Sequence, residues 1–173
     1  MPLNFTACRD TFVLLAACAL AAGAAAQGAA PGNTASPACP PAASYKAPQV
    51  YGLWTARFTA PPDGLPAAAT LLLQQHAEFS ASLSGFVSRD LGVAAGTPKI
   101  AGHAARALLA GDLEDGILVL DESSDNTSIT GIWNGEVVAE SCGQQIRGVW
   151  KDTSKSAPPD APEVPFLLTR RPG

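Results

Sequence analysis

The chain has 173 residues and a formal net charge of −4, and only 15% of its residues are Asp, Glu, Lys or Arg. An acidic chain offers no electrostatic basis for binding nucleic acid or an anionic membrane surface, so we expect neither as a partner. The length predicts a single domain, and 16 glycines with 15 prolines favour turns and short strands over long helices.

Residues 1–26 have the layout of an export signal. A weakly polar start that contains Arg9 precedes an apolar run at 11–22, and Ala24-Ala25-Ala26 supplies small residues before a cleavage point. A membrane-spanning helix would need about 20 apolar residues, and the strongly apolar part of this segment is shorter. The segment therefore predicts a signal peptide that is removed from the mature protein.

The same segment also resembles a bacterial lipoprotein signal, because Leu15-Ala16-Ala17 precedes Cys18. In that alternative Cys18 is lipidated and the mature chain begins there, so that the membrane is reached only through this residue. Both hypotheses place the protein outside the cytoplasm: in the periplasm, secreted, or anchored to the outer membrane.

Cys39 and Cys142 remain after either form of processing. In an oxidising compartment two cysteines most simply form one disulfide, which would stabilise the fold by roughly 4 to 5 kcal/mol on the chain-entropy model. Two free thiols are the alternative. Residues 27–49 are rich in Ala and Pro and predict a flexible tether, which Cys39 would pin to a folded domain at 50–173.

The folded domain carries the two-residue periodicity of β-strands. At 78–89 apolar residues alternate mostly with serines, and 145–152 alternates in the same way. Eight or nine strands are expected, at Tyr51–Phe58, Ala68–Gln75, Glu78–Arg89, Ala105–Leu113, Gly116–Asp121, Ser128–Trp133, Glu136–Cys142, Gln145–Asp152 and Pro165–Arg171. The one helical candidate, 101–109, is short enough to be marginal.

Turn signals separate these strands. Asn134-Gly135 is the strongest hairpin signal, since both central residues of a type I′ turn have positive φ, and Asp115-Gly116 and Asp63-Gly64 are weaker examples. Short strands with hairpin-length links predict an all-β fold, an antiparallel up-and-down meander. Closing the meander, fully or nearly, into a barrel would remove its exposed edges.

All three tryptophans follow a glycine by two residues. Residues two apart share one face of a strand, so each glycine would leave room for the indole beside it. Filling of the barrel interior is the favoured interpretation, and ligand contact is the alternative. The candidate binding residues are Trp54, Trp133, Trp150 and, from a relaxed form of the pattern that starts at Gly85, Phe86.

Gly52-Leu53-Trp54 on the first strand, followed by antiparallel strands with further Gly-x-aromatic pairs, resembles the calycin-type barrels. These include avidins, lipocalins and small bacterial metalloprotease inhibitors, and the resemblance covers about residues 51–171. Similarity to the inhibitors implies a disulfide and a flexible N-terminal trunk, which would correspond here to Cys39 and to residues 27–46. The cysteine spacing in this chain is wider than in that family. Thr55 to Phe58 replace the Asn/Ser-containing turn that an avidin-like biotin site requires, which argues against biotin.

The sequence carries no recognisable catalytic or metal motif. His76 and His103 are its only histidines, and neither stands in a metal-ligand spacing. Acidic residues concentrate at Asp112, Glu114, Asp115, Asp121, Glu122 and Asp125. They do not match a calcium loop, because Ile132 occupies the place of the bidentate Glu, and solvated turns are the better interpretation. We therefore predict no catalytic residue, no metal and no cofactor.

These patterns together predict an exported, non-catalytic binding module of the cell envelope. Its partner would be an envelope protein or a small apolar ligand. Two alternatives stay open: an accessory lipoprotein of a larger envelope assembly, anchored through Cys18, and a hydrolase with an unrecognised pair of carboxylates.

Overall fold

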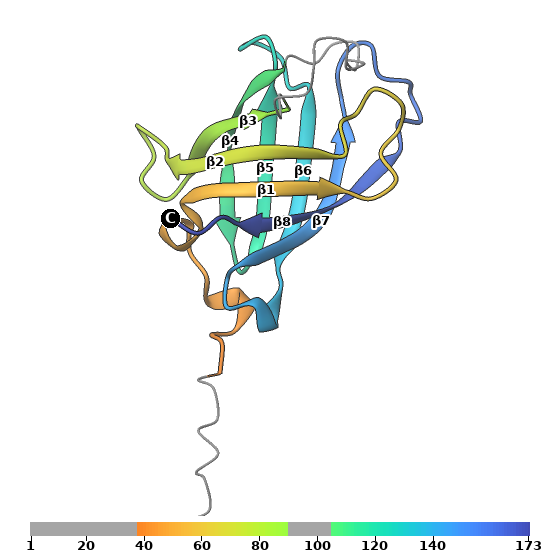
Figure 1. Ribbon diagram of the computed structural model, residues 1–173. Helices are drawn as coiled ribbons and strands as arrows, with labels where there is room; N and C mark the ends of the chain where they lie inside the picture. Colours follow the sequence, from red (N-terminus) through yellow and green to blue (C-terminus); the bar gives the residue numbers. More distant parts are fainter. Residues whose placement is uncertain (1–37, 90–104) are drawn as a thin grey trace, which may run out of the picture. The chain divides into compact units, whose positions relative to one another are not determined.

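The structure, a computed structural model, describes residues 38–89 and 105–173, and these form a closed antiparallel β-barrel (Figure 1). Its strands are β1 (Gly52–Phe58), β2 (Ala68–Gln75), β3 (Leu83–Ser88), β4 (Arg106–Glu114), β5 (Ile117–Ser123), β6 (Gly131–Val137), β7 (Gln145–Asp152) and β8 (Glu163–Arg170). Each strand pairs with its neighbours in sequence, and β1 pairs with β8 to close the barrel. The predicted all-β meander is confirmed, with eight strands in the described residues.

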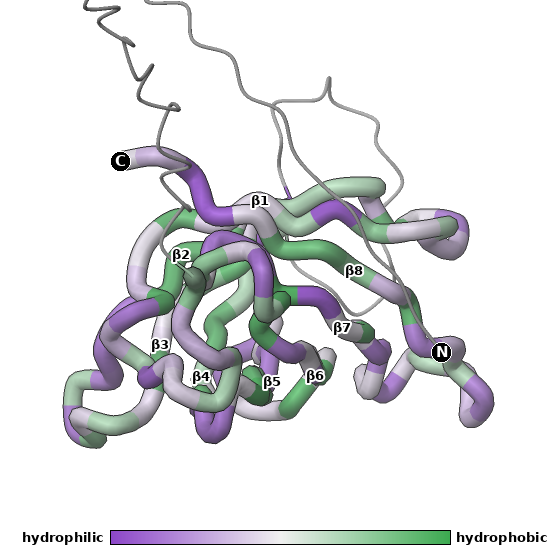
Figure 2. Tube along the Cα trace, turned by 90° about the horizontal axis from the view of Figure 1, so that it is seen from below, coloured by the Kyte–Doolittle hydropathy of each residue, from purple (hydrophilic) through white to green (hydrophobic). Residues whose placement is uncertain are grey.

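Alternation of apolar and polar residues determines which side chains fill the barrel. In β5, Leu118 and Leu120 are buried while Ile117 and Val119 face outward, and the other strands alternate in the same way. The tube in Figure 2 changes repeatedly between hydrophobic and hydrophilic residues. The three tryptophans are at most 1% exposed and occupy the interior.

The N-terminal segment covers one end of the barrel, which we call the covered end. It forms two short 3₁₀ turns, η1 (Ala42–Ser44) and η2 (Ala47–Val50). Tyr45, Ala47 and Val50 are buried in the core cluster. The flexible tether predicted at 27–49 is therefore wrong for residues 38–49, because these apolar side chains gain burial against the barrel. Residues 27–37, the signal segment and Cys18 lie outside the described residues.

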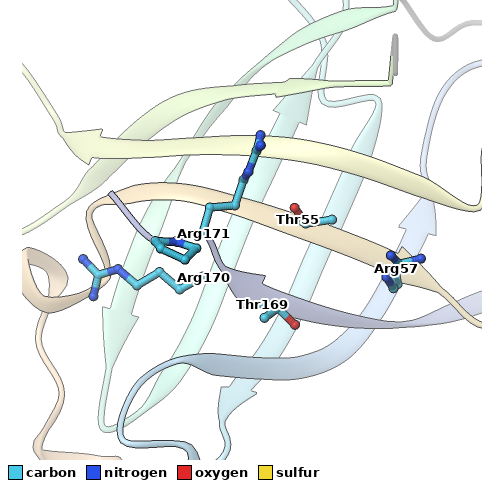
Figure 3. A pocket seen from close by; sticks show the side chains of 6 residues that line it. Thr55, Arg57, Thr169, Arg170 and Arg171 are labelled. Atoms are coloured by element: carbon cyan, nitrogen blue, oxygen red, sulfur yellow. The ribbon is translucent and has the colours of Figure 1, made fainter. Parts of the chain in front are cut away.

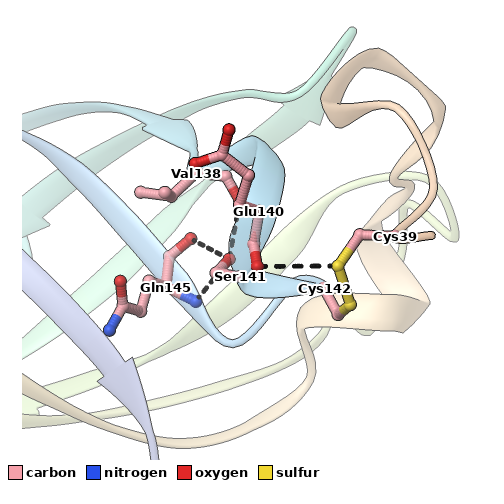
Figure 4. The surroundings of a disulfide bond; sticks show 6 residues. All are labelled: Cys39, Val138, Glu140, Ser141, Cys142 and Gln145. Carbon is pink, nitrogen blue, oxygen red and sulfur yellow. Dashed lines mark hydrogen bonds between the residues drawn. A yellow bond between two sulfur atoms is a disulfide. The ribbon is translucent and has the colours of Figure 1, made fainter. Parts of the chain in front are cut away.

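A disulfide between Cys39 and Cys142 ties this N-terminal segment to the β6–β7 connection (Figure 4). The two cysteines lie 103 residues apart in sequence, with a Cα–Cα distance of 4.7 Å. Cys142 has a φ of 50° and follows the turn η3 (Ala139–Ser141). Ser141 Oγ donates to the carbonyl of Val138 and accepts from the backbone N–H of Gln145, which holds the connection in shape. The predicted pairing is confirmed.

The Asn134-Gly135 hairpin prediction is wrong, because both residues lie inside β6. Gly135 pairs with Gly148 of β7. A Cβ at 135 would lie 2.9 Å from Ile146 Cγ2, and a Cβ at 148 would overlap the carbonyl oxygen of Asn134. Glycine here serves close backbone approach rather than a turn. The two strands predicted at 128–133 and 136–142 are thus one strand, followed by η3.

Other predictions differ less from the structure. Asp115 and Gly116 form the predicted β4–β5 turn, with φ values of 49° and 79°. The predicted strand at 78–89 begins only at Leu83, because a turn that leaves Phe79 60% exposed precedes it. Residues 106–109 of the helical candidate 101–109 belong to β4, where Ala107 and Leu109 alternate into the core.

Candidate functional site

The structure does not bring the four predicted binding residues together. Trp54, Trp133 and Trp150 lie inside the barrel, whereas Phe86 is half-buried and belongs to the outward row of β3. The interior and the outer face are therefore two separate candidate sites.

Trp54 belongs to the covered end of the barrel. Its indole Nε1 donates to the carbonyl oxygen of Val50 at 2.8 Å, immediately beneath η2. The Arg170 guanidinium lies 5.8 Å from the Trp54 ring centroid and donates to the carbonyl oxygens of Gln49 and Tyr51. These contacts satisfy the backbone groups at the end of the 3₁₀ turn, so Trp54 seals this end rather than lining an open cavity.

Trp133 and Trp150 instead meet a buried ion pair. Their indole Nε1 atoms donate to Oε2 of Glu122, at 3.0 and 3.2 Å respectively. The two terminal nitrogens of Arg89 donate to the two oxygens of the same carboxylate, each at 2.7 Å. Glu122 is fully buried and Arg89 is 7% exposed. The bidentate geometry and the two indole donors offset the cost of removing both charges from water.

Gly131 explains how these side chains fit together. A Cβ at this position would lie 2.6 Å from Nε1 of Trp150 and 3.3 Å from Oε2 of Glu122. The glycine of Gly131-Ile132-Trp133 therefore makes room for the tryptophan of the neighbouring strand, not for its own, which corrects the expectation from sequence. Phe58 packs beside both indoles, at centroid distances of 5.5 and 6.2 Å.

The geometry around Glu122 is that of a structural group. Its Oε2 accepts from Arg89, Trp133 and Trp150, and its Oε1 accepts from Arg89. A carboxylate whose oxygens are occupied in this way is not positioned to take a proton from a substrate.

Sequence reasoning missed this cluster because it assigned Glu122 to a group of solvated acids. The signal was present in the alternation, since Leu118, Leu120 and Glu122 are successive residues of the buried row of β5. Arg89 likewise lies two residues after Val87, a buried residue of β3, so alternation places it on the inward side.

The outer face of β1–β4 carries a row of apolar side chains in direct register. Leu53 pairs with Leu72, Leu72 with Phe86, and Phe86 with Leu108. We call these four residues the apolar row. Leu53 is 44% exposed and Leu108 is 51% exposed. The Arg106 guanidinium lies over the Phe86 ring, 3.6 Å from its centroid, which is a close cation–π contact.

A row of hydroxyl side chains runs beside the apolar row. Thr169, Thr55, Thr70 and Ser88 follow one another across β8, β1, β2 and β3. The outward positions of β1, β2, β3 and residues 106–110 of β4 contain no Asp or Glu, but they include Arg57 and Arg106. These positions therefore carry positive charge in a chain whose net charge is −4, and outward acids begin beside them, at Asp112 of β4 and at Asp121 of β5, which pairs with Ala110.

An open pocket of about 260 Å³ lies over β1 and β8 (Figure 3). Its lining residues are Thr55, Arg57, Thr169, Arg170, Arg171 and Pro172. In Figure 3 the Arg57 and Arg171 side chains stand at different places along the pocket, while Arg170 points away towards η2.

The remaining polar residues of interest organise turns. Oδ1 of Asp125 accepts from the backbone N–H groups of Ser128 (2.7 Å) and Thr127 (2.9 Å). These two hydrogen bonds, Ser128 first, lower the pKa of Asp125 from 3.8 to about 2. Nδ1 of His76 accepts from the backbone N–H groups of Glu78 and Phe79, and His103 lies outside the described residues.

Within residues 38–89 and 105–173, no three His, Cys, Asp or Glu side chains are grouped so as to hold a metal ion. The same residues include no helix that is long and apolar enough to cross a bilayer. Comparison with models of known protein families and with curated protein sequences found no match to this chain.

Proposed function

We propose that this protein is a non-catalytic binding module of an extracytoplasmic compartment, and that it recognises a protein partner through the outer face of β1–β4. The observation that carries the proposal is the apolar row, four outward side chains in register on four neighbouring strands. Leu53 and Leu108 are exposed and Leu72 and Phe86 between them are half-buried, and outward apolar side chains gathered in this way commonly mark an interaction site. Arg106 stacked on Phe86 adds the residue types that are enriched at protein interfaces.

A protein partner is favoured over a small apolar ligand by the way the interior is filled. Three indoles, the Arg89–Glu122 pair and several leucines occupy inward positions at 7% exposure or less. Strand addition is disfavoured as well, because the closed barrel pairs β1 with β8 and offers no free sheet edge between them. Recognition would therefore use outward side chains.

The proposal includes an extracytoplasmic location and a calycin-type barrel. The Cys39–Cys142 disulfide supports an oxidising compartment, in agreement with the export signal expected at 1–26. Gly52-Leu53-Trp54 on β1 and a disulfide-linked N-terminal segment support a calycin-type barrel that acts by protein recognition, as an inhibitor does, rather than as a carrier.

The two alternatives have less support. The buried carboxylate of the described residues, Glu122, gives the hydrolase hypothesis no support, because Arg89 and two indoles occupy it. An accessory lipoprotein would also bind a protein, and it differs only in an anchor at Cys18.

Size-exclusion chromatography of gently solubilised cell envelope tests the proposal. The native protein should elute in a complex larger than the purified chain, and Leu108→Glu should return it to the elution volume of the purified chain. Val119→Glu is the matched control, because Val119 is also an outward strand residue and is 43% exposed. If Leu108→Glu leaves the complex intact, or Val119→Glu disrupts it equally, the proposed face is wrong.

A further inference from the structure

The outward residues of β1 and β8 repeat one another. On β1 they are Leu53, Thr55 and Arg57, and on the paired part of β8 and its continuation they are Leu167, Thr169 and Arg171. Glu163 and Pro165 are the outward residues at the start of β8, before this repeat. Because the strands are antiparallel, Leu53 lies opposite Arg171, Thr55 opposite Thr169, and Arg57 opposite Leu167. The β1–β8 seam, defined by these six residues, thus has an approximate local two-fold symmetry about the Thr55–Thr169 pair.

Each end of the seam presents the same pair of groups, an arginine beside an exposed leucine. Leu53 is 44% exposed and Leu167 is 36% exposed, and both arginines are exposed. Within the described part of the chain, ion pairs are found for Arg89 and Arg147 but not for Arg57 or Arg171. The two threonines lie between the arginines and line the same open pocket.

The spacing of the arginines determines which anion fits. Arg171 stands opposite Leu53, four residues from Arg57 along β1, so their backbones are about 13 Å apart along the strand direction. A segment that runs along the seam and meets each arginine at its own strand position therefore has to span about the same distance. An extended peptide covers about 13 Å in four residues, so acidic side chains at positions i and i+4 match the two arginines.

We propose that the β1–β8 seam binds an extended acidic segment of a protein partner, with two carboxylate side chains four residues apart, one on Arg57 and one on Arg171. Guanidinium groups bind carboxylates through paired hydrogen bonds, and the threonine hydroxyls are available to the backbone between them. A protein segment fits better than a simple polyanion, because Leu53 belongs both to the seam and to the apolar row. A second copy that docks through the same seam is a poor fit, since it would bring four arginines of like charge together.

This inference rests on the proposed function, because it names the chemistry of the same partner. Binding to the full chain is measured by fluorescence anisotropy with a labelled seven-residue peptide, Ser-Glu-Ser-Leu-Ser-Glu-Ser. A second peptide of the same composition with adjacent glutamates, and a third with glutamines in their place, are the peptide controls. Tripolyphosphate is tested as a competitor.

The spaced peptide should bind more tightly than both controls, and Arg57→Gln and Arg171→Gln should each weaken it about threefold to fivefold, with the double variant losing both contributions. Arg147→Gln is the matched control, because it removes one exposed arginine of β7 that pairs with Glu136, and binding should stay unchanged. Equal binding of the adjacent-glutamate peptide, equal loss in Arg147→Gln, or displacement by tripolyphosphate at lower concentration than by unlabelled peptide would each overturn the inference. The Leu108-dependent complex would still stand in those cases, so failure of the seam is distinguishable from failure of the proposed function.

Discussion

An arginine beside an aromatic ring occurs both inside the barrel and on its outer wall, in opposite surroundings. Inside, the Arg89 guanidinium lies 5.5 Å from the Trp150 ring centroid and is paired with Glu122. Outside, Arg106 lies 3.6 Å from the Phe86 ring centroid on a stretch of wall without carboxylates. The same pair of groups is buried and structural where the chain supplies the carboxylate, and it stands on the outer wall where the chain does not.

The largest expected effect comes from breaking the inner pair. Glu122→Ala should lower the free energy of unfolding by about 3 to 5 kcal/mol, because it leaves Arg89 buried without its partner and two indole N–H groups without their acceptor. Urea denaturation followed by tryptophan fluorescence measures the change.

Glu136→Ala is the control for this variant. Glu136 pairs with Arg147 at the surface, where the two side chains are 49% and 66% exposed, and its loss should cost less than about 1 kcal/mol. Equal destabilisation by the two variants would contradict a structural role for the inner pair.

The covered end should show the next largest effect. Replacing both Cys39 and Cys142 with serine should lower the free energy of unfolding by about 2 to 4 kcal/mol, the usual range for a disulfide and less than the chain-entropy model gives for a loop of this length. Thermal unfolding with and without reductant measures it: reductant should lower the Tm of the native protein and leave the Tm of the double variant unchanged. An unmoved native Tm would show that the disulfide does not hold the N-terminal segment on the barrel.

A smaller effect is expected for the outer arginine. Arg106→Ala should change the free energy of unfolding by about 1 kcal/mol or less, since it removes one exposed cation–π contact. Arg89→Ala, its inner counterpart, should cost several times as much because Glu122 then stays buried without its charge partner. Similar costs for the two variants, measured by urea denaturation, would remove the distinction between the inner and outer pairs.

Much of this architecture could be predicted from sequence. The ranges predicted for β2 and β7 agree with the structure, because every second residue from 69 to 73 and from 146 to 150 is apolar or glycine, even though the outward residues Leu72 and Val149 are apolar too. The error at Asn134-Gly135 has a physical cause: glycine permits both positive φ and close backbone approach, and only the partner strand, with Gly148, decides which applies.

The candidate sites were harder to predict from the sequence than the strands. Alternation places Glu122 inside, but its partner Arg89 lies 33 residues away, and no local pattern links the two. The apolar row depends on how four strands pair in register. If one strand slipped by one residue, its side chains would move to the other face and the row would be broken. Phe86 was predicted as a binding residue from its place beside Gly85, and the surface to which it belongs emerges only from strand pairing.

The smallest predicted effect concerns pH and the loop at Asp125. The pKa of this carboxyl is about 2 in the folded chain, below its ordinary value of 3.8, because the ionised form accepts backbone hydrogen bonds. The resulting stabilisation is complete above about pH 4 and is lost as the pH falls towards 2. Asp125→Asn should therefore lower Tm slightly at pH 6, and the difference from the native protein should shrink at pH 2. A constant difference across this range would contradict the assignment.

Site-specific photocrosslinking in intact cells tests most directly the claim that recognition takes place on the outer face of β1–β4. A photoreactive residue at position 108 should give a discrete crosslinked protein adduct, and the same residue at position 119, similarly exposed on β5, should give none or far less. Equal adducts from both positions, or an adduct from position 119 alone, would contradict the account.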